Sequence, residues 1–475
     1  MEKATPRKMK LAEALIIFAV VASLIGVAAV GGLFPVAIGI FLALIITMAY
    51  GMLVLHFSFD ELFDASTQTV SSVFYGLMFC MIVGFVSATW LESGTIQFLL
   101  YWGLELIAPS IFLLVAFVSC VIISFITGQA WTLIPTLGLA YIGIADALGI
   151  SLPLAAAAIV SGCFFGDACS PLCEVPAIAT SCAGSSDTMK TIRSAIPTKG
   201  VGLVVGAIFY GFMGLNGSVS TTNFAQSEEL MQALVAGFNL SPLTLLPLIV
   251  VFVAVVFKLS PMIAVILGAL VGIVMSVLLQ GMSFASALQM SWSGYVSTTG
   301  HELLDSLLTR GGFMDFSGTI MMLLIAFCFA GVANKVGMLE VIVQALLKRV
   351  KGRAPLVIAT TITTLLGVML ACSANVSSVL TGSIYKDAYR EAGMGPSDLA
   401  REMSVNGSVF NAMLPWSASG ALCYSALGVM PFEYWKYMIP FWVALVLNIV
   451  WAALGLFLEK VESVQVEDVG SATGV

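Results

Sequence analysis

Long apolar runs are the feature that most constrains how this chain can fold. Between Glu105 and Asp146 there is no Asp, Glu, Lys or Arg, and other runs exceed the roughly 18 residues that suffice to span a bilayer. Only 9% of the chain is charged and 60% is hydrophobic, whereas a soluble chain is about 25% charged. The sequence therefore predicts an integral membrane protein.

The membrane spans are expected to be helices. A transmembrane barrel would show strands of about ten residues with alternating polarity, whereas this chain carries continuous Leu, Ile, Val, Ala and Phe. The apolar run 11–34 is too long for the core of a cleaved signal peptide, so we expect it to remain as the first helix. We predict ten spans, near residues 12–33, 35–55, 72–91, 152–184, 200–216, 243–258, 260–280, 316–334, 403–428 and 436–458.

Two further apolar regions, 109–146 and 354–393, are each too long for one helix. Each contains a polar break, Thr127-Gly128-Gln129 in the first and Cys372-Ser373-Ala374-Asn375 in the second. We predict that each forms a re-entrant hairpin, which enters the bilayer and returns on the same side. The basic clusters then fall on one side, so the positive-inside rule predicts that both termini are cytoplasmic.

The chain also repeats itself. Asp60-Glu61-Leu62-Phe63-Asp64 matches His301-Glu302-Leu303-Leu304-Asp305, and Ser161-Gly162-Cys163-Phe164-Phe165 matches Asn406-Gly407-Ser408-Val409-Phe410. Each half carries five spans, an odd number, so the halves must be inverted, as in many secondary transporters. We therefore predict an all-α polytopic protein with about ten transmembrane helices, two re-entrant hairpins and two broken helices. Its predicted parts are a cytoplasmic tail (1–10), a first inverted repeat (11–217), an external linker (218–241), a second inverted repeat (242–458) and a cytoplasmic tail (459–475).

The segment 161–176 is polar inside an apolar span. It holds Asp167 and Glu174, and Pro171 should unwind the helix near 166–171, because proline removes a backbone donor and clashes with the preceding turn. Unwinding frees carbonyl oxygens beside a carboxylate, which suits a small hard cation or a proton. The alternatives are that Asp167 caps a kinked helix, and that Glu174 faces a vestibule or pairs with Arg193 or Lys199.

The other interruptions offer neutral groups. At the matching place in the second half, Pro415 is the helix breaker and no carboxylate is present. We assign ion binding and proton coupling to Asp167, Ser170, Glu174 and Thr127. We assign substrate binding to Gln129, Trp131, Thr132, Ser373, Asn375, Ser377, Asn406, Asn411 and Ser417. For Asn375 the equal alternative is a hydrogen bond between helices.

Several classes of function are disfavoured. No GxxxxGK[ST] phosphate loop is present, so we expect no ATP hydrolysis. The chain has two histidines and nine cysteines without metal-ligand spacing, so we expect no resident metal, no cofactor and no catalytic residue. The basic residues are scattered, which disfavours nucleic acid as a partner. The expected partners are membrane lipid and the transported Na⁺ and H⁺, with a small organic solute as an open alternative.

The segment Phe165-Gly166-Asp167-Ala168-Cys169-Ser170-Pro171-Leu172 resembles the FGDxxSPL core of the NhaC family of bacterial Na⁺/H⁺ antiporters. The resemblance covers about residues 30–455 and includes Leu414-Pro415-Trp416. It implies Na⁺/H⁺ antiport, or a related exchange of small carboxylates or amino acids coupled to these ions. It also implies a transport domain that moves against a scaffold, a homodimer, and a place in the bacterial inner membrane.

The chain departs from the family pattern at two places. The lysine that usually follows the family's aspartate is here Ala168, and the run SDTTN is here Cys173-Glu174-Val175-Pro176-Ala177. Several hydroxyl and amide ligands for a cation are therefore missing. The departure leaves room for a second function, in which the chain carries an amino acid or a carboxylate together with Na⁺ or H⁺.

Overall fold

The structure is a computed structural model that describes residues 6–31, 33–216, 223–309, 311–348, 350 and 352–459. Within these residues every regular element is a helix, as the sequence predicts. The predicted tails 1–10 and 459–475 and the predicted linker 218–241 lie partly outside the described residues. The side chain of Asp167 also lies outside what the structure describes, although its backbone belongs to a helix.

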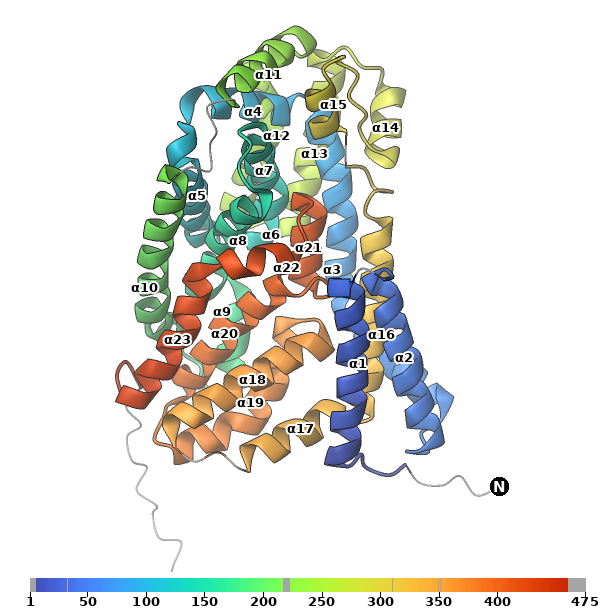
Figure 1. Cartoon of the computed structure of the whole chain (residues 1–475), viewed down its shortest axis with the longest axis vertical. Coiled ribbons are helices and arrows are strands. Elements are labelled where there is room, and N and C mark those ends of the chain that lie inside the picture. The colour runs from blue at the N-terminus through green and yellow to red at the C-terminus, as the bar shows by residue number, and fades with distance from the viewer. Residues whose placement is uncertain are drawn as a thin grey trace, which may run out of the picture.

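The helices follow one another without intervening strands in the described chain (Figure 1). The first half contains α1 (Leu11–Gly31), α2 (Val36–Leu53), α3 (Phe59–Glu92), α4 (Thr95–Leu106), α5 (Phe112–Thr127), α6 (Ala130–Leu133), α7 (Leu139–Ala147), α8 (Leu152–Cys169), α9 (Glu174–Cys182) and α10 (Thr188–Leu215). A short π-helical segment, Ile134–Gly138, joins α6 to α7. Short 3₁₀ turns lie at Pro109–Ile111, Pro242–Leu245 and Trp435–Tyr437.

The second half contains the helices α11 to α23. They are α11 (Asn223–Gly237), α12 (Leu246–Val256), α13 (Pro261–Leu279), α14 (Phe284–Ser293), α15 (Glu302–Leu308), α16 (Ser317–Lys335), α17 (Met338–Leu347), α18 (Arg353–Ala371), α19 (Ala374–Glu391), α20 (Pro396–Met413), α21 (Ala418–Leu427), α22 (Pro431–Tyr434) and α23 (Ile439–Leu454). The helix α11 lies in the segment that the sequence predicts to be a linker.

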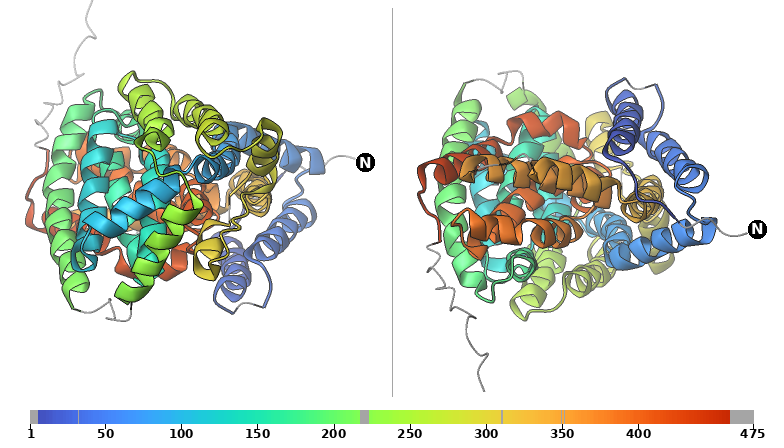
Figure 2. Two further views of the ribbon diagram at one scale, coloured as in Figure 1. Left: turned by 90° about the horizontal axis from the view of Figure 1, so that it is seen from above. Right: turned by 90° about the horizontal axis from the view of Figure 1, so that it is seen from below.

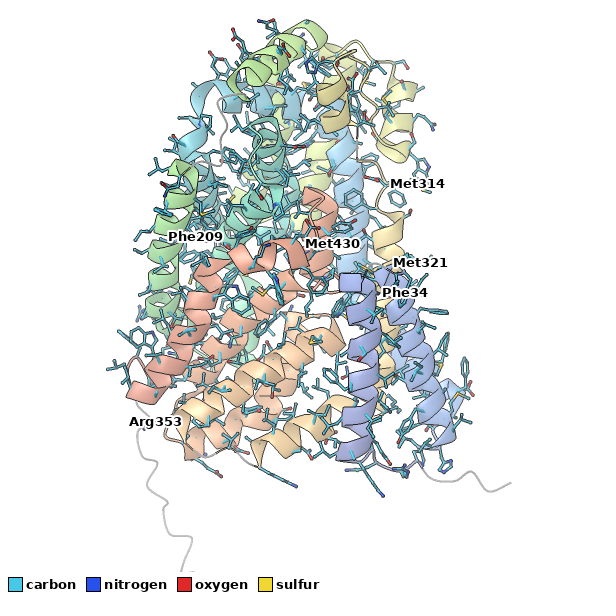
Figure 3. All side chains as sticks on the ribbon, viewed as in Figure 1. Phe34, Phe209, Met314, Met321, Arg353 and Met430 are labelled. Atoms are coloured by element: carbon cyan, nitrogen blue, oxygen red, sulfur yellow. The ribbon has the colours of Figure 1, made fainter. Side chains whose placement is uncertain are left out.

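The protein is a multi-pass membrane protein. Among the described residues nine helices are long and apolar enough to cross a membrane, and eleven if two bent pairs each count as one span. Apolar side chains cover the outer faces of these helices (Figure 3). On α10, Ile208 and Phe212 are 67% and 61% exposed, which suits a lipid-facing surface because lipid, unlike water, does not penalise exposed apolar groups.

Small residues let the central helices approach closely. Where α3 crosses α16, a Cβ on Gly331 would lie 2.5 Å from the carbonyl oxygen of Ala65. Where α5 crosses α8, the hydroxyl of Ser124 donates to the carbonyl of Gly162 at 2.9 Å and accepts from the amide of Gly166 at 3.2 Å. Glycine and serine at such crossings give close packing and interhelical hydrogen bonds, which drive helix association in lipid.

Several helix boundaries differ from the sequence prediction, since α3 begins at Phe59 rather than near 72 and α20 begins at Pro396 rather than near 403. The sequence predicts unwinding from 166, whereas the helix α8 continues through Gly166 to Cys169. Gly166 packs closely on Ser124 of α5, and this contact favours a regular backbone there. The helix α10 begins at Thr188 rather than near 200. Its N-terminus is capped by Asp187, whose side chain accepts from the amide of Lys190 at 3.1 Å.

The helices sort into groups when the molecule is seen along its length (Figure 2). The hairpin of α1 and α2 lies at one edge, and α10 and α23 lie together at the opposite edge (Figures 1 and 2). The short helices α4, α11 and α15 gather at one end of the molecule, and α17 lies at the other end (Figure 1). The interrupted helices occupy the space between these boundaries.

The loop that precedes α15 is organised around the carboxylate of Asp305. Its Oδ1 accepts hydrogen bonds from the hydroxyl of Ser297 at 2.7 Å and from the amide and hydroxyl of Thr299 at 2.8 and 2.7 Å. Its Oδ2 accepts from the amide of Gly300 at 2.9 Å. These hydrogen bonds lower the pKa of Asp305 to about 2, and the bond from the hydroxyl of Thr299 contributes most. Each donor lowers the pKa because it stabilises the charged form of the carboxyl group.

We expect Asp305→Ala to raise hydrogen exchange at the amides of Thr299 and Gly300, measured by mass spectrometry. A carboxylate with a lowered pKa stabilises the fold above its ordinary pKa near 3.9 and loses that contribution as the pH falls toward 2. The loss of hydrogen-exchange protection in the variant, relative to wild type, should therefore be the same at pH 7 and pH 5. Asp64→Ala, which changes an exposed carboxylate of α3, is the control, and unchanged exchange in Asp305→Ala would contradict the assignment.

Candidate functional site

A cavity of about 580 Å³ lies where the interrupted helices meet. Its wall is formed by the two hairpins, the first break and the helices on either side of the second break. We call α5 with α6–α7 the first hairpin, α18 with α19 the second hairpin, residues 170–173 the first break and residues 414–417 the second break. The lining residues are Val73, Tyr75, Gly76, Phe79, Gly128, Gln129, Ala130, Trp131, Leu172, Cys173, Glu174, Val175, Ser260, Pro261, Ser373, Ala374, Asn375, Ser408, Asn411, Ala418 and Ser419.

The tip of the first hairpin packs directly on the first break. The helix α5 ends at Gly128, which has φ +66°, the left-handed conformation that glycine adopts without a steric penalty. A Cβ at this position would lie 2.8 Å from the amide nitrogen of Cys173 and 2.9 Å from the carbonyl carbon of Leu172. The backbone of the hairpin tip is therefore in contact with the backbone of the break, and only glycine fits between them.

The tip of the second hairpin has the same relation to the second break. The helix α18 ends at Cys372, also in the left-handed region at φ +55°. The amide of Ala418, the first residue of α21, donates to the carbonyl of Cys372 at 3.0 Å. The indole of Trp416 donates to the carbonyl of Met369 at 3.1 Å. These bonds supply partners for backbone groups that the two interruptions release from regular helix.

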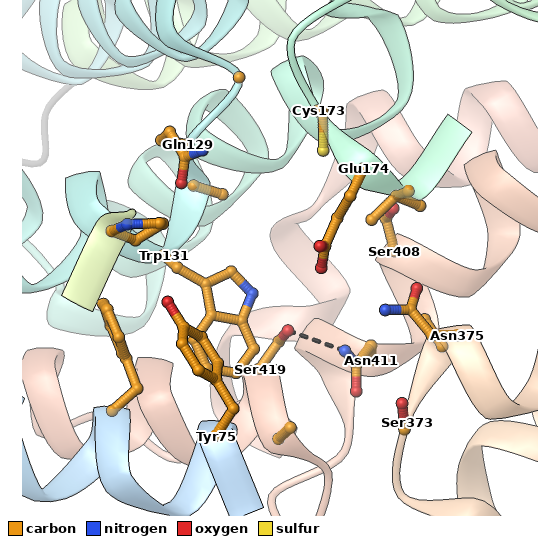
Figure 4. Close-up of a pocket in the computed structure, with 18 of the residues that line it drawn as sticks. Tyr75, Gln129, Trp131, Cys173, Glu174, Ser373, Asn375, Ser408, Asn411 and Ser419 are labelled. Atoms are coloured by element: carbon orange, nitrogen blue, oxygen red, sulfur yellow. Dashed lines mark hydrogen bonds between the residues drawn. The ribbon is translucent and has the colours of Figure 1, made fainter. Parts of the chain in front are cut away.

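The cavity wall carries one carboxylate among neutral polar groups. Glu174 begins α9 and is exposed, and its side chain points into the cavity toward Asn411 and Ser419 (Figure 4). The amide nitrogen of Asn411 donates to the hydroxyl of Ser419 at 2.8 Å, whereas the amide oxygen of Asn411 is buried without a hydrogen-bond partner. The wall thus offers a negative charge and an unused acceptor.

Glu174 forms no ion pair with any residue that the structure describes. A pair with Lys199 is one of the alternatives that the sequence leaves open, but the ammonium of Lys199 is buried elsewhere, 4.5 Å from the ring centre of Phe441, and donates to the carbonyl of Phe164 at 3.5 Å. The carboxylate of Glu174 therefore remains available to a group that enters the cavity.

Comparison with known proteins connects this arrangement to a family. A family model described as the Na⁺/H⁺ antiporter family matches residues 219–456. The Na⁺/H⁺ antiporter NhaC of Alkalihalophilus pseudofirmus is 33% identical over 391 residues, which cover 80% of this chain and 82% of that protein. The chain belongs to the Na⁺/H⁺ antiporter family. The resemblance to NhaC antiporters seen in the sequence is therefore confirmed.

Other relatives of this antiporter-family chain carry different names. The malate-2H⁺/Na⁺-lactate antiporter of Bacillus subtilis is 31% identical over 438 residues, which cover 92% of this chain and 93% of that protein. The arginine/ornithine antiporter ArcD of Halobacterium salinarum is 29% identical over 383 residues, which cover 80% of this chain and 79% of that protein. The names of these relatives agree on antiport and differ in the transported species.

The structure of this family member places six of the residues assigned from the sequence in the cavity wall. They are Gln129, Trp131, Glu174, Ser373, Asn375 and Asn411. They come from both hairpins, from the start of α9 and from α20, segments far apart in the chain. The side chain of Asp167 lies outside the described residues, so its assignment stays a prediction.

Six other assigned residues lie behind the cavity wall. Five of them bond within the protein through hydroxyl or amide groups. Thr127 donates to the carbonyl of Ile123 at 2.8 Å, Ser377 to the carbonyl of Thr364 at 3.0 Å, Ser417 to the carbonyl of Leu414 at 2.7 Å, and Asn406 to the carboxylate of Glu402 at 3.1 Å, while the hydroxyl of Ser170 accepts from the amide of Leu172 at 3.2 Å. The sixth, Thr132, is buried, and its hydroxyl has no hydrogen-bond partner among the described residues. Their contacts hold the interruptions in shape.

Sequence reasoning missed the cavity residues that α3 and α21 supply. Tyr75 and Phe79 lie in a segment of α3 that looks like an ordinary apolar span, so no local signal marks them. Ser408 was recoverable, because Ser408 and Asn411 are three residues apart and share one face of α20. Ser419 lies two residues after Ser417, on the first turn of α21, so its place next to the second break is the signal that marks it.

A buried charge cluster at the start of α20 was also missed. The side chains of Asp398, Arg401 and Glu402 are fully buried, with 3.6 Å between Arg401 and each carboxylate. Arg401 donates to the carbonyl of Phe457 at 3.0 Å, and Glu402 accepts from the amide of Asn448 at 3.1 Å. Buried charges persist when they are paired and hydrogen-bonded, and this cluster joins α20 to α23 and the segment after it.

We expect Gly128→Ala to destabilise the protein more than Gly428→Ala. Both glycines end a helix with positive φ, +66° and +71°, so each alanine costs about 1–2 kcal/mol for the left-handed conformation. A Cβ on Gly428 would meet no atom within 4 Å, whereas a Cβ on Gly128 would meet the backbone of the first break. Thermal unfolding in detergent should show the larger drop in midpoint for Gly128→Ala, and equal drops would contradict this packing.

Proposed function

We propose that this chain is a secondary active transporter that exchanges Na⁺ for H⁺ at the cavity. The observation that carries the proposal is the position of Glu174, a carboxylate that points into a cavity beside four helix interruptions and has no ion-pair partner among the described residues. Membership of the Na⁺/H⁺ antiporter family supports the same ions. A carboxylate at such a site binds a cation or a proton but not both, and this competition is the basis of exchange.

Asp167 is the second carboxylate of the proposal. It follows Gly166 in α8, one helical turn before the first break, and ionisable residues within membrane spans mark ion pathways by default. We infer that Asp167 alternately holds Na⁺ and H⁺, and that Glu174 draws cations to it from the open cavity. Neutral oxygens such as those of Asn375 and Asn411 would replace part of the water shell of Na⁺.

We also propose that residues 11–217 and 242–458 form two inverted repeats. The proposal of two repeats is supported by equivalent backbone features that occur in the same order in each half of the chain. Gly94 and Gly337 each follow a long helix, with φ +81° and +76°, and begin the next one. Gly128 and Cys372 end the first arm of each hairpin in the left-handed region, and each hairpin tip lies on the break that follows it in the chain.

The movement and orientation of the protein complete the proposal. A transport domain made of both hairpins and both broken helices would move against α1–α3 and α12–α16, in the manner of an elevator. Ten crossings with two re-entrant hairpins would leave both termini in the cytoplasm of a bacterium, and the functional unit would be a homodimer. The cavity wall supports a moving boundary, because α3 contributes Tyr75 and Phe79 while the interruptions contribute the polar groups.

Proton flux in liposomes tests the exchange. We expect Na⁺ added outside to make an acidic lumen more alkaline, reported by a pH-sensitive dye, and we expect Asp167→Asn to abolish the response. Glu174→Gln should raise the Na⁺ concentration for a half-maximal response about tenfold, the equivalent of ~1.4 kcal/mol of lost attraction. Glu340→Gln, at an exposed carboxylate of α17, is the control. A full response in Asp167→Asn would refute Na⁺/H⁺ exchange at this carboxylate.

The size of the cavity favours a second candidate function. A volume of about 580 Å³ greatly exceeds what one cation needs and lies in the range of small-molecule pockets. The names of two relatives include organic solutes. The second candidate is therefore the carriage of a small organic solute coupled to Na⁺ or H⁺, and in that case Na⁺ alone would move few protons until the solute is added.

A further inference from the structure

One side of the cavity is an aromatic panel. Tyr75 and Phe79, one turn apart on α3, have ring centres 6.4 Å apart at 27°. Phe79 meets Trp131 of the first hairpin edge to face, with ring centres 5.4 Å apart at 74°. Tyr75 is 50% exposed, so the panel presents ring surface to whatever occupies the cavity (Figure 4).

The opposite side of the cavity is polar and carries a single formal charge. Among the described lining residues Glu174 is the only ionisable one apart from Tyr75 and Cys173, and Lys, Arg and His are absent from the wall. Each hairpin tip and each break brings a helix C-terminus beside a helix N-terminus, so the partial charges of the helix ends oppose one another. The net field of the described wall is therefore that of the carboxylate.

The charge of Glu174 favours a donor in the occupant, whereas the neutral wall groups Gln129, Asn375, Ser373, Ser408 and Ser419 can both donate and accept. The carboxylate of Glu174 accepts only, and the buried oxygen of Asn411 has no donor. An ammonium or guanidinium group donates only, whereas a carboxylate ligand accepts only and would be repelled by Glu174. The volume corresponds to the liquid space of on the order of twenty water molecules, which leaves room for an apolar group beside the charge.

We propose that the cavity binds a small organic cation, an amine or guanidinium compound with an apolar portion. Its positive charge lies at Glu174, and its apolar portion lies on Tyr75 and Trp131, which the buried ring of Phe79 supports from behind. The faces of the two outer rings also attract the cation. The proposal rests on the function proposed above, since it assigns a substrate class to the same cavity. It separates this chain from a carrier of dicarboxylates, which would need a basic residue where the wall has Glu174.

Calorimetry with the purified full-length protein tests whether the cavity prefers a positively charged ligand. The probes are phenethylamine, agmatine and L-malate at pH 7. We expect heat of binding from the two cations and none from malate. Glu174→Gln should weaken cation binding about tenfold or more and Trp131→Leu roughly fivefold or more. Trp292→Leu removes an exposed indole outside the cavity, stacked on Phe313, and should leave binding unchanged.

The outcomes separate the two proposals. Binding of malate but not of amines, or equal amine binding in wild type and Glu174→Gln, would overturn the organic-cation site. Absence of any organic binding in protein that still exchanges Na⁺ for H⁺ would overturn it as well, and would leave the exchange proposal standing. Binding of amines without any Na⁺-driven proton flux would support the organic-cation site and refute Na⁺/H⁺ exchange.

A size series gives a second test. Gly76 of α3 faces Trp131, and a Cβ there would lie 3.6 Å from its ring, an ordinary contact. We expect Gly76→Ala to bind phenethylamine and methylammonium with little change. Gly76→Leu should occupy the space beside the indole and weaken phenethylamine at least tenfold more than methylammonium. Equal weakening of both amines by Gly76→Leu would place the apolar portion elsewhere and overturn the panel assignment.

Discussion

Interrupting a helix inside a membrane leaves backbone N–H and C=O groups that neither water nor lipid can satisfy, so the protein must supply their partners. This requirement governs the centre of the molecule. The amide of Ala418 donates to the carbonyl of Cys372, and the tip of the first hairpin lies against the backbone of Leu172 and Cys173. Each interruption therefore needs another one beside it, and the cavity forms where they meet.

Close approach of the backbones is possible only because the residues at the contacts are small. Gly128 lies between a hairpin tip and a break, Gly166 lies on Ser124 of α5, and Gly331 lies on the backbone of α3. In lipid, helices gain little from burying apolar surface and associate through such packing and through interhelical hydrogen bonds. The same contacts that stabilise the bundle fix the relative positions of Glu174, Asn411 and Trp131.

The protein holds charge within its helical body in two different ways. Asp398, Arg401 and Glu402 are fully buried, and the amides of Asn406 and Asn448 bond Glu402. These ion pairs and hydrogen bonds connect α20 to α23, although Nε and Nη2 of Arg401 and Oε1 of Glu402 have no hydrogen-bond partner among the described residues. Glu174 is exposed in the cavity and forms no described ion pair. The buried cluster around Arg401 therefore serves to hold helices together, whereas the carboxylate of Glu174 is left for a ligand.

The sequence by itself determined the membrane class, the helical spans, the approximate places of all four interruptions and the family. Apolar runs, prolines and polar breaks are local in the chain, so no packing is needed to read them. It also identified six cavity residues, because residues beside an interruption are restricted to its neighbourhood. It did not fix the start of the first break, since Gly166, which packs on Ser124 of α5, stays within helix α8.

Only the tertiary structure decided which side chains face the cavity. Successive residues of a helix point about 100° apart, so Trp131 lines the cavity while its neighbour Thr132 is buried behind it. The aromatic panel is the clearest case, because Tyr75 and Phe79 look like lipid-facing residues in sequence. Their role arises when α3 packs against a hairpin that follows it by some fifty residues, and no local pattern encodes that contact.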